Sequence, residues 1–172
     1  MNGLDVFIIL LIAGFVVLGA VRGFGQTAYD ALGLYSALWL ANTFSIPLAA
    51  HANFHTGGAG INHSWAYSLL FIVFSVILFF VSKYAYGMTL LNAGMFDKLL
   101  GITAGVIAGV ILAHSLTVAL IMADPERQGM GGQVAQGMVS DELYSFPGYH
   151  SVLDTITGAT SYRRELPNMA GK

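Results

Sequence analysis

The sequence predicts an all-α integral membrane protein built as a four-transmembrane-helix bundle, and two observations lead to that prediction. Of the 172 residues, 56% are apolar and only 9% are charged, whereas soluble domains carry about 25% charged residues. Four windows are also apolar over roughly 20 residues, which is long enough to cross about 30 Å of hydrocarbon as a helix. The predicted spans are residues 4–21, 28–47, 65–82 and 99–122. They form a predicted membrane domain, 1–123, followed by a tail, 124–172.

The first window is predicted to be a retained span rather than a secretory signal peptide. Asp5 lies near its start and Arg22 beyond its far end, which reverses the charge order of a signal peptide. Cytoplasmic loops collect lysine and arginine. Arg22 follows the first span, Lys83 and Lys98 follow the third, and the loop 51–64 contains neither residue type. The sequence therefore predicts that both termini, and the tail, lie outside the cytoplasm.

A polar pair is predicted beside the turn that joins the first two spans. Gly23 allows a tight chain reversal, which brings Arg22 close to Asp30, about one turn inside the second span. A carboxylate within a span needs a partner that faces the bundle, so we expect an Arg22–Asp30 pair near the inner surface. The alternative is that Asp30 belongs to an ion or proton pathway with His114 and a serine stripe along the third span. The stripe consists of Ser68, Ser75 and Ser82.

Small residues spaced four apart predict how the spans pack. The fourth span carries Gly101, Gly105 and Gly109, and such a row lets two helix backbones approach each other closely in lipid. Packing within one monomer is the main expectation. The alternative is a homo-oligomer in which two copies pair through this glycine face.

Two regions outside the spans are predicted to contain short helices. In residues 83–98, apolar side chains recur between charged ends, which favours a short helix in the inner membrane interface before the last span. In the tail, 133–146 and 148–158 are predicted to form modest helices, and the end of the chain is predicted to fray. About 49 residues cannot bury a large independent core. We therefore expect a partly ordered helical tail that packs on the outer ends of the spans or binds a partner.

No catalytic, cofactor or metal site is predicted. The chain lacks cysteine and the spacing motifs of phosphate-binding loops, nucleophile elbows and zinc proteases. A net charge of −2 offers no basic surface for nucleic acid. His51, His55 and His63 could together bind zinc, but no carboxylate lies near them in the sequence. We interpret that segment as a polar outer loop.

Three stretches of the sequence resemble the colicin V production protein (CvpA) family. Near the start of the chain an aspartate is followed by a run of aliphatic residues. The first turn has the pattern Gly-x-x-Arg-Gly-Phe, and the last span begins Asp-Lys-Leu-Leu-Gly. The matching residues are Asp5, Gly19, Arg22, Gly23, Phe24, Asp97, Leu100, Gly101, Gly105 and Gly109. Lys98 stands where the family usually has arginine. The resemblance covers about residues 1–122.

The resemblance implies a multi-pass protein of the bacterial inner membrane, associated with production or export of the peptide toxin colicin V and with envelope and biofilm phenotypes. It does not imply a defined molecular mechanism. We expect an accessory or scaffold protein without catalytic chemistry, which lies in the lipid bilayer and holds a membrane or periplasmic protein partner. The alternative is a small oligomeric channel or transporter that uses Asp30, the serine stripe and His114.

Overall fold

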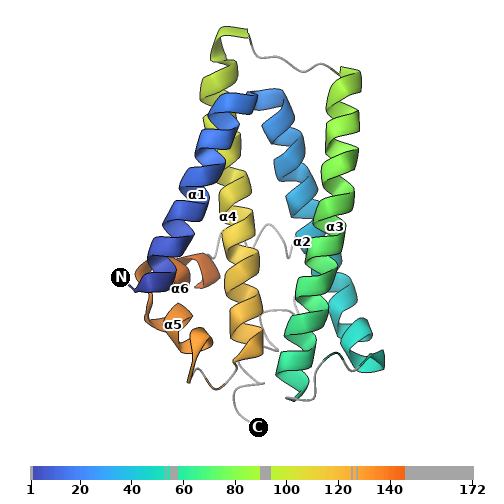
Figure 1. Cartoon of the computed structure of the whole chain (residues 1–172), viewed down its shortest axis with the longest axis vertical. Helices are drawn as coiled ribbons and strands as arrows, with labels where there is room; N and C mark the ends of the chain where they lie inside the picture. Colours follow the sequence, from blue (N-terminus) through green and yellow to red (C-terminus); the bar gives the residue numbers. More distant parts are fainter. Residues whose placement is uncertain are drawn as a thin grey trace.

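The fold is a bundle of four long helices. The computed structural model describes residues 2–52, 54, 58–89, 94–124, 126 and 128–145, and every regular element in that part of the chain is helical. The long helices are α1 (Gly3–Arg22), α2 (Phe24–His51), α3 (Ala59–Thr89) and α4 (Asp97–Ala123). Figure 1 shows them running up and down in turn. All four are long and apolar enough to cross a membrane, so the predicted fold class is confirmed.

The helices are longer than the predicted spans, and the connections between them are shorter. Gly23 alone separates α1 from α2, with a φ of 83° that favours glycine. α2 continues through Pro47 to His51, and α3 begins at Ala59 rather than at residue 65. An apolar window marks only the part of a helix that lies in hydrocarbon. Polar residues at its ends continue the helix because the backbone hydrogen bonds continue beyond the lipid.

The predicted interfacial helix over residues 83–98 does not form as a separate element in the described part of that segment. Residues 83–89 are the last turns of α3 instead. A short 3₁₀ turn, η1 (Gly94–Phe96), leads directly into α4. Residues 90–93 lie outside the described residues. Of the apolar residues that suggested a second helix, Met88 lies in α3, and Met95 and Phe96 lie in η1.

α1 and α4 pack against each other backbone to backbone. A Cβ atom added to Gly101 or Gly105 would overlap backbone atoms of α1, and one added to Gly109 would lie 3.0 Å from the Cα of Ile12. Packing within one monomer, which the glycine row predicted, is therefore confirmed. The face that the alternative assigned to a second copy of the chain is already covered by α1.

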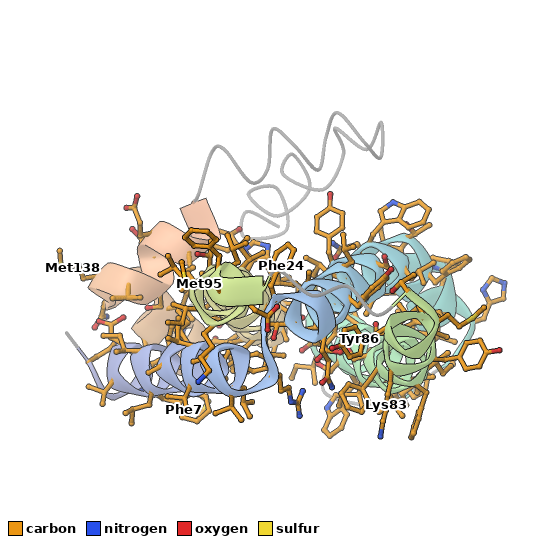
Figure 2. All side chains as sticks on the ribbon, turned by 90° about the horizontal axis from the view of Figure 1, so that it is seen from above. Phe7, Phe24, Lys83, Tyr86, Met95 and Met138 are labelled. Carbon is orange, nitrogen blue, oxygen red and sulfur yellow. The ribbon has the colours of Figure 1, made fainter. Side chains whose placement is uncertain are left out.

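The apolar core lies between α2, α3 and α4. Its buried members are Ala37, Leu38, Ala41, Tyr67, Phe71, Ile111, Val118 and Met122. Large apolar side chains also cover the outer surface of the bundle, such as Phe7, which points away from the other helices in Figure 2. A helix that is apolar on all sides is typical of a membrane span. Apolar side chains both in the core and on the surface of the bundle are therefore consistent with a lipid environment.

The tail forms two short helices where the sequence predicted one over residues 133–146. They are α5 (Met130–Gln136) and α6 (Met138–Ser145), divided at Gly137. In Figure 1 they lie beside the N-terminal end of α1, along the last turns of α4. Both helices contact α4, and α6 also contacts α1. The helix predicted for 148–158 and the predicted frayed end lie outside the described residues.

Candidate functional site

At the end of the bundle where α1 turns into α2, two motifs of the resemblance come together. The backbone N–H of Phe24, the first residue of α2, donates to Asp97 Oδ1 at 3.1 Å. Asp97 therefore caps α2 from a distant part of the chain, where the local residue, Gly23, has no side chain to do so. A Cβ atom on Gly23 would overlap the Asp97 carboxylate. The glycine of the Arg-Gly-Phe pattern is thus required both by its φ and by the close approach of this carboxylate.

The same end of the bundle holds the closest contact between α1 and α4. A Cβ atom on Gly19 or on Gly101 would overlap the carbonyl oxygen of the other residue. Leu100, next to Gly101, is turned away from this contact. It lines a groove of about 430 Å³ between α2 and α4, whose other lining residues are almost all apolar. The motif residues in this region therefore build the fold rather than a polar site.

Arg22 and Asp30 form the predicted ion pair. Arg22 Nη1 lies 3.1 Å from Asp30 Oδ2, and the two side chains are 34% and 11% exposed. The guanidinium also lies 6.0 Å from the centre of the Phe79 ring, which is within the range of a cation–π contact. The pair links the start of α2 to the end of α1.

The side chains suggested for a polar pathway do not gather at one place. Ser82 Oγ donates to a backbone carbonyl of α2 at 2.9 Å. Ser68 lines a separate pocket of about 200 Å³ between α3 and α4. Ser75 Oγ is buried without a hydrogen-bond partner among the described residues. His114 lies roughly 13 Å from the C-terminal end of α4. In the part of the chain that is described, these groups are distributed along the bundle.

A different cluster forms at the opposite end of the bundle, around Asp5. The Asp5 side chain is fully buried, and it accepts hydrogen bonds from the backbone N–H groups of Met138, Val139 and Ser140 at 3.0, 3.2 and 3.1 Å. Ser140 Oγ lies 3.1 Å from the same carboxylate. The first N–H groups of a helix have no partner within it. Asp5 therefore caps α6, and its negative charge faces the positive end of that helix.

Two neighbours of Asp5 complete this contact. Asn2 caps α1 together with Asp5, and Asn2 Nδ2 donates to the carbonyl of Gln133 in α5 at 2.6 Å. Gly137 lies so close that a Cβ atom there would overlap Asp5 and Ser140 Oγ. The glycine that divides the two tail helices therefore also lets α6 approach α1.

His114 holds the opposite end of α6. Its Nδ1 lies 3.0 Å from the backbone carbonyl oxygen of Leu143, so the ring donates to one of the carbonyls that a helix end leaves without a partner. The His114 side chain is buried. The antiparallel register of α1 and α4 places Asp5 beside about Leu116, at nearly the depth of His114. Two buried ionisable side chains thus contact the two ends of one short tail helix.

The comparison with known protein families identifies the family to which this arrangement belongs. The family model described as Colicin V production protein matches residues 4–141, most of the chain. The chain belongs to the colicin V production protein family. The family name suggests a membrane protein involved in colicin V production. A search of curated proteins found no match, and neither did a search of solved structures.

The region matched by the colicin V production family extends beyond the resemblance found in the sequence, which ended at about residue 122. It begins one residue before Asp5 and ends one residue after Ser140. The contact between Asp5 and Ser140 therefore joins the two ends of the matched region. The match therefore extends through α5 and into the start of α6, beyond residue 123, where the sequence analysis placed the end of the membrane domain.

Sequence reasoning missed a further cap in this colicin V production family member. Asp124 accepts hydrogen bonds from the backbone N–H groups of Gly129, Gln128 and Gly131 at 2.6, 3.3 and 3.1 Å. The hydrogen bond from Gly129 contributes most to lowering the pKa of Asp124, and the bonds from Gln128 and Gly131 lower it further. The sequence did offer a signal for this cap, because Asp124 follows the last span and precedes a glycine-rich segment.

The histidines that were considered as zinc ligands make separate contacts. His63 Nε2 lies 3.0 Å from Ser45 Oγ, and His51 Nδ1 lies 2.8 Å from the carbonyl oxygen of Pro47. His55 lies outside the described residues. Among the residues that the structure does place, no three histidine or acidic side chains lie close enough to share a metal ion. The zinc alternative therefore has no ligand set in this part of the chain.

Proposed function

We propose that this member of the colicin V production protein family is a non-catalytic accessory scaffold of the bacterial inner membrane. It presents α5 and α6, together called the tail unit, to a membrane or periplasmic protein partner outside the cytoplasm. The tasks it supports are production or export of the toxin colicin V and maintenance of the envelope and of biofilms.

The observation that carries this proposal is the attachment of the tail unit to the membrane helices. Ionisable side chains buried in membrane proteins commonly mark an ion or substrate pathway. Here Asp5 and His114 contact the two ends of α6 instead. A surface that is ordered before a partner arrives loses less conformational entropy on binding. Fixing the tail unit in this way therefore favours a binding role.

The outward side of the tail unit has the chemistry of a docking surface. Met130 in α5 is 63% exposed and Met138 in α6 is 78% exposed, and Figure 2 shows Met138 pointing away from the bundle. Methionine is flexible and polarisable, and it is common on surfaces that bind other proteins. These two side chains are therefore our candidates for the partner contact.

A channel or transporter remains the second candidate because one observation favours it. Asp30 Oδ1, Asn42 Oδ1 and Ser75 Oγ are buried without a hydrogen-bond partner among the described residues. All three belong to α2 or α3. However, Asp30 and Asn42 lie roughly 18 Å apart along α2, so these oxygens do not form a continuous polar row.

The two candidates are separated by measuring colicin V release from a producing strain that lacks this protein and carries a variant copy. Met130→Gln combined with Met138→Gln changes the outward side of the tail unit, whereas Asp30→Asn combined with Ser75→Ala changes the polar groups of the spans. Gly14→Ala is the control, because nothing lies within 4 Å of a Cβ atom at Gly14. Immunoblots of membranes verify equal abundance.

We expect several-fold lower release with the methionine variant and unchanged release with the other two variants. Loss of release with the Asp30 and Ser75 variant alone contradicts the scaffold role and supports the channel.

A further inference from the structure

Packing alone does not account for the position of α6. The helix has eight residues, and helices shorter than about 12–15 residues are marginal on their own. Met138 is mostly exposed, and Asp141 and Glu142 are exposed as well. Ser140, a small polar residue, is buried. The apolar contact of α6 with the bundle comes from Tyr144, which packs against the core, and from the half-buried Val139 and Leu143.

Polar contacts at its two ends hold α6 in place. At the N-terminal end the Asp5 carboxylate accepts from three backbone N–H groups, and at the C-terminal end His114 donates to the Leu143 carbonyl. Hydrogen bonds to a charged group are stronger than those between neutral groups. Asp5 is therefore the stronger of the two attachments. The apolar anchors of the tail unit are Val134, which is buried, and Tyr144, which packs against the core.

The four-helix bundle does not depend on these contacts. The glycine row of α4 packs against α1, and most of the core consists of side chains from α2, α3 and α4. Removing the tail unit from its position would uncover Asp5, His114 and one side of α4. It would leave the close contact of α1 with α4, and the core between the other helices, in place.

We propose that the tail unit is held on the bundle by a latch, formed by Asp5 and His114, and that it undocks as one body without unfolding the four long helices. Undocking exposes the inner side of α5 and α6 together with the two latch residues. The latch therefore regulates how the tail unit is offered to a partner, and in this respect the inference rests on the proposed function.

The absence of cysteine from the natural chain makes a thiol-labelling experiment direct. Val134→Cys reports on the buried side of the tail unit, and Ala37→Cys reports on the core of the bundle, because both positions are buried. Each reporter is introduced into the full chain in lipid nanodiscs, and the rate of reaction with a maleimide is measured. The reporters are then combined with Asp5→Asn. The matched control is Asp141→Asn, which removes the same charge from an exposed position on α6.

We expect Asp5→Asn to raise the labelling rate at position 134 about tenfold or more, because a charged acceptor of several hydrogen bonds is lost. Asp141→Asn should change that rate little, and position 37 should stay protected in every variant. Continued protection of position 134 in Asp5→Asn would show that apolar packing holds the tail. Simultaneous exposure of positions 134 and 37 would show that the tail unit and the four long helices unfold together as one cooperative unit. Either result overturns the proposal.

His114 provides a second test with a conservative variant. His114→Leu removes the donor to Leu143 and should raise labelling at position 134, whereas His114→Asn retains a donor and should restore part of the protection. Equal labelling in both variants contradicts a latch contact at this end.

The labelling experiment needs no partner, so it tests the latch separately from the proposed function. If the methionine variant releases colicin V normally, the scaffold role is wrong, while the labelling result for the latch still stands.

Discussion

At the scale of single residues, three aspartates begin helices to which they do not belong. Asp97 caps α2, Asp5 caps α6 and Asp124 caps α5. In each case the residue before the helix is a glycine, which has no side chain to accept from the first N–H groups. The glycine also allows the distant carboxylate to approach closely, as at Gly23 and Gly137. Asp5 and Asp97 thus connect helices that lie far apart in the sequence, whereas Asp124 connects two consecutive helices.

Substitution of Gly23 tests this arrangement. Gly23→Ala should lower the free energy of unfolding by about 2 kcal/mol or more, because an unfavourable φ and an overlap with Asp97 act together. Gly58→Ala serves as a control for the φ alone, since Gly58 also has a positive φ but nothing within 4 Å of its Cβ position. Denaturation in mixed micelles measures the free energy of unfolding of both variants. Equal losses in the two variants would show that the Asp97 contact adds nothing.

The ion pair between Arg22 and Asp30 should contribute little to stability. Both side chains are partly exposed, and exposed pairs typically contribute about 1 kcal/mol or less. A double-mutant cycle with Arg22→Gln and Asp30→Asn measures the coupling energy directly. A coupling energy well above about 2 kcal/mol would mean that lipid desolvates the pair much more strongly than we expect.

At the scale of helices, the glycine row of α4 determines which helix is its close neighbour. Lipid does not drive apolar helices together, so close backbone contact and polar groups decide their pairing. The row faces α1 from Gly101 to Gly109. The sequence identified the row but not its partner, because a row of small residues fits any helix that can approach closely.

Gly105→Ala distinguishes packing within one chain from pairing of two chains. The added Cβ atom would overlap the backbone of Phe15, so we expect the unfolding free energy to fall by about 1–3 kcal/mol. The mass of the assembly in nanodiscs, which reports the number of chains in each assembly, should not change. A change from a larger to a smaller assembly, with normal stability of each chain, would instead place the row between two copies.

The cap of α5 should weaken only in acid. Backbone hydrogen bonds lower the pKa of Asp124 in the folded protein relative to its ordinary value of 3.8. The cap is therefore fully present above that value, and it is lost as pH falls through the lower native pKa. The protection of Val134→Cys is expressed at each pH as its labelling rate divided by that of the same thiol in the unfolded chain, because the reactive thiolate becomes scarcer in acid. This protection should stay constant from neutral pH down to about 3.8 and fall below it. With Asp124→Asn, the part of the fall that is due to this carboxylate should disappear. A fall already near neutral pH would contradict the assignment.

At the scale of the whole molecule, the start of the chain and the tail unit lie at the same end. Asn2 contacts α5 and Asp5 contacts α6, while Gly23 and η1 lie together at the opposite end (Figure 1). An even number of spans agrees with this arrangement. The distribution of lysine and arginine then predicts which end faces the cytoplasm.

Single cysteines test this orientation. Asn2→Cys and Gln133→Cys should both react with a maleimide that cannot cross the inner membrane, and the two together should form a short cross-link. Lys98→Cys should react only after the membrane is made permeable. Labelling of position 98 alone in intact cells would invert the predicted topology.

The sequence by itself determined the membrane setting, the four spans, the Arg22–Asp30 pair and the family motifs. Each of these depends on local composition or on residues close together in the chain. Only the tertiary structure decided what Asp5 and His114 do, since their partners in α6 are more than twenty residues away and present backbone groups, which every residue carries. It also showed where the tail unit lies, against α1 and α4. The amphipathic pattern of this region predicts a helix, but the position of that helix depends on polar groups supplied by other helices.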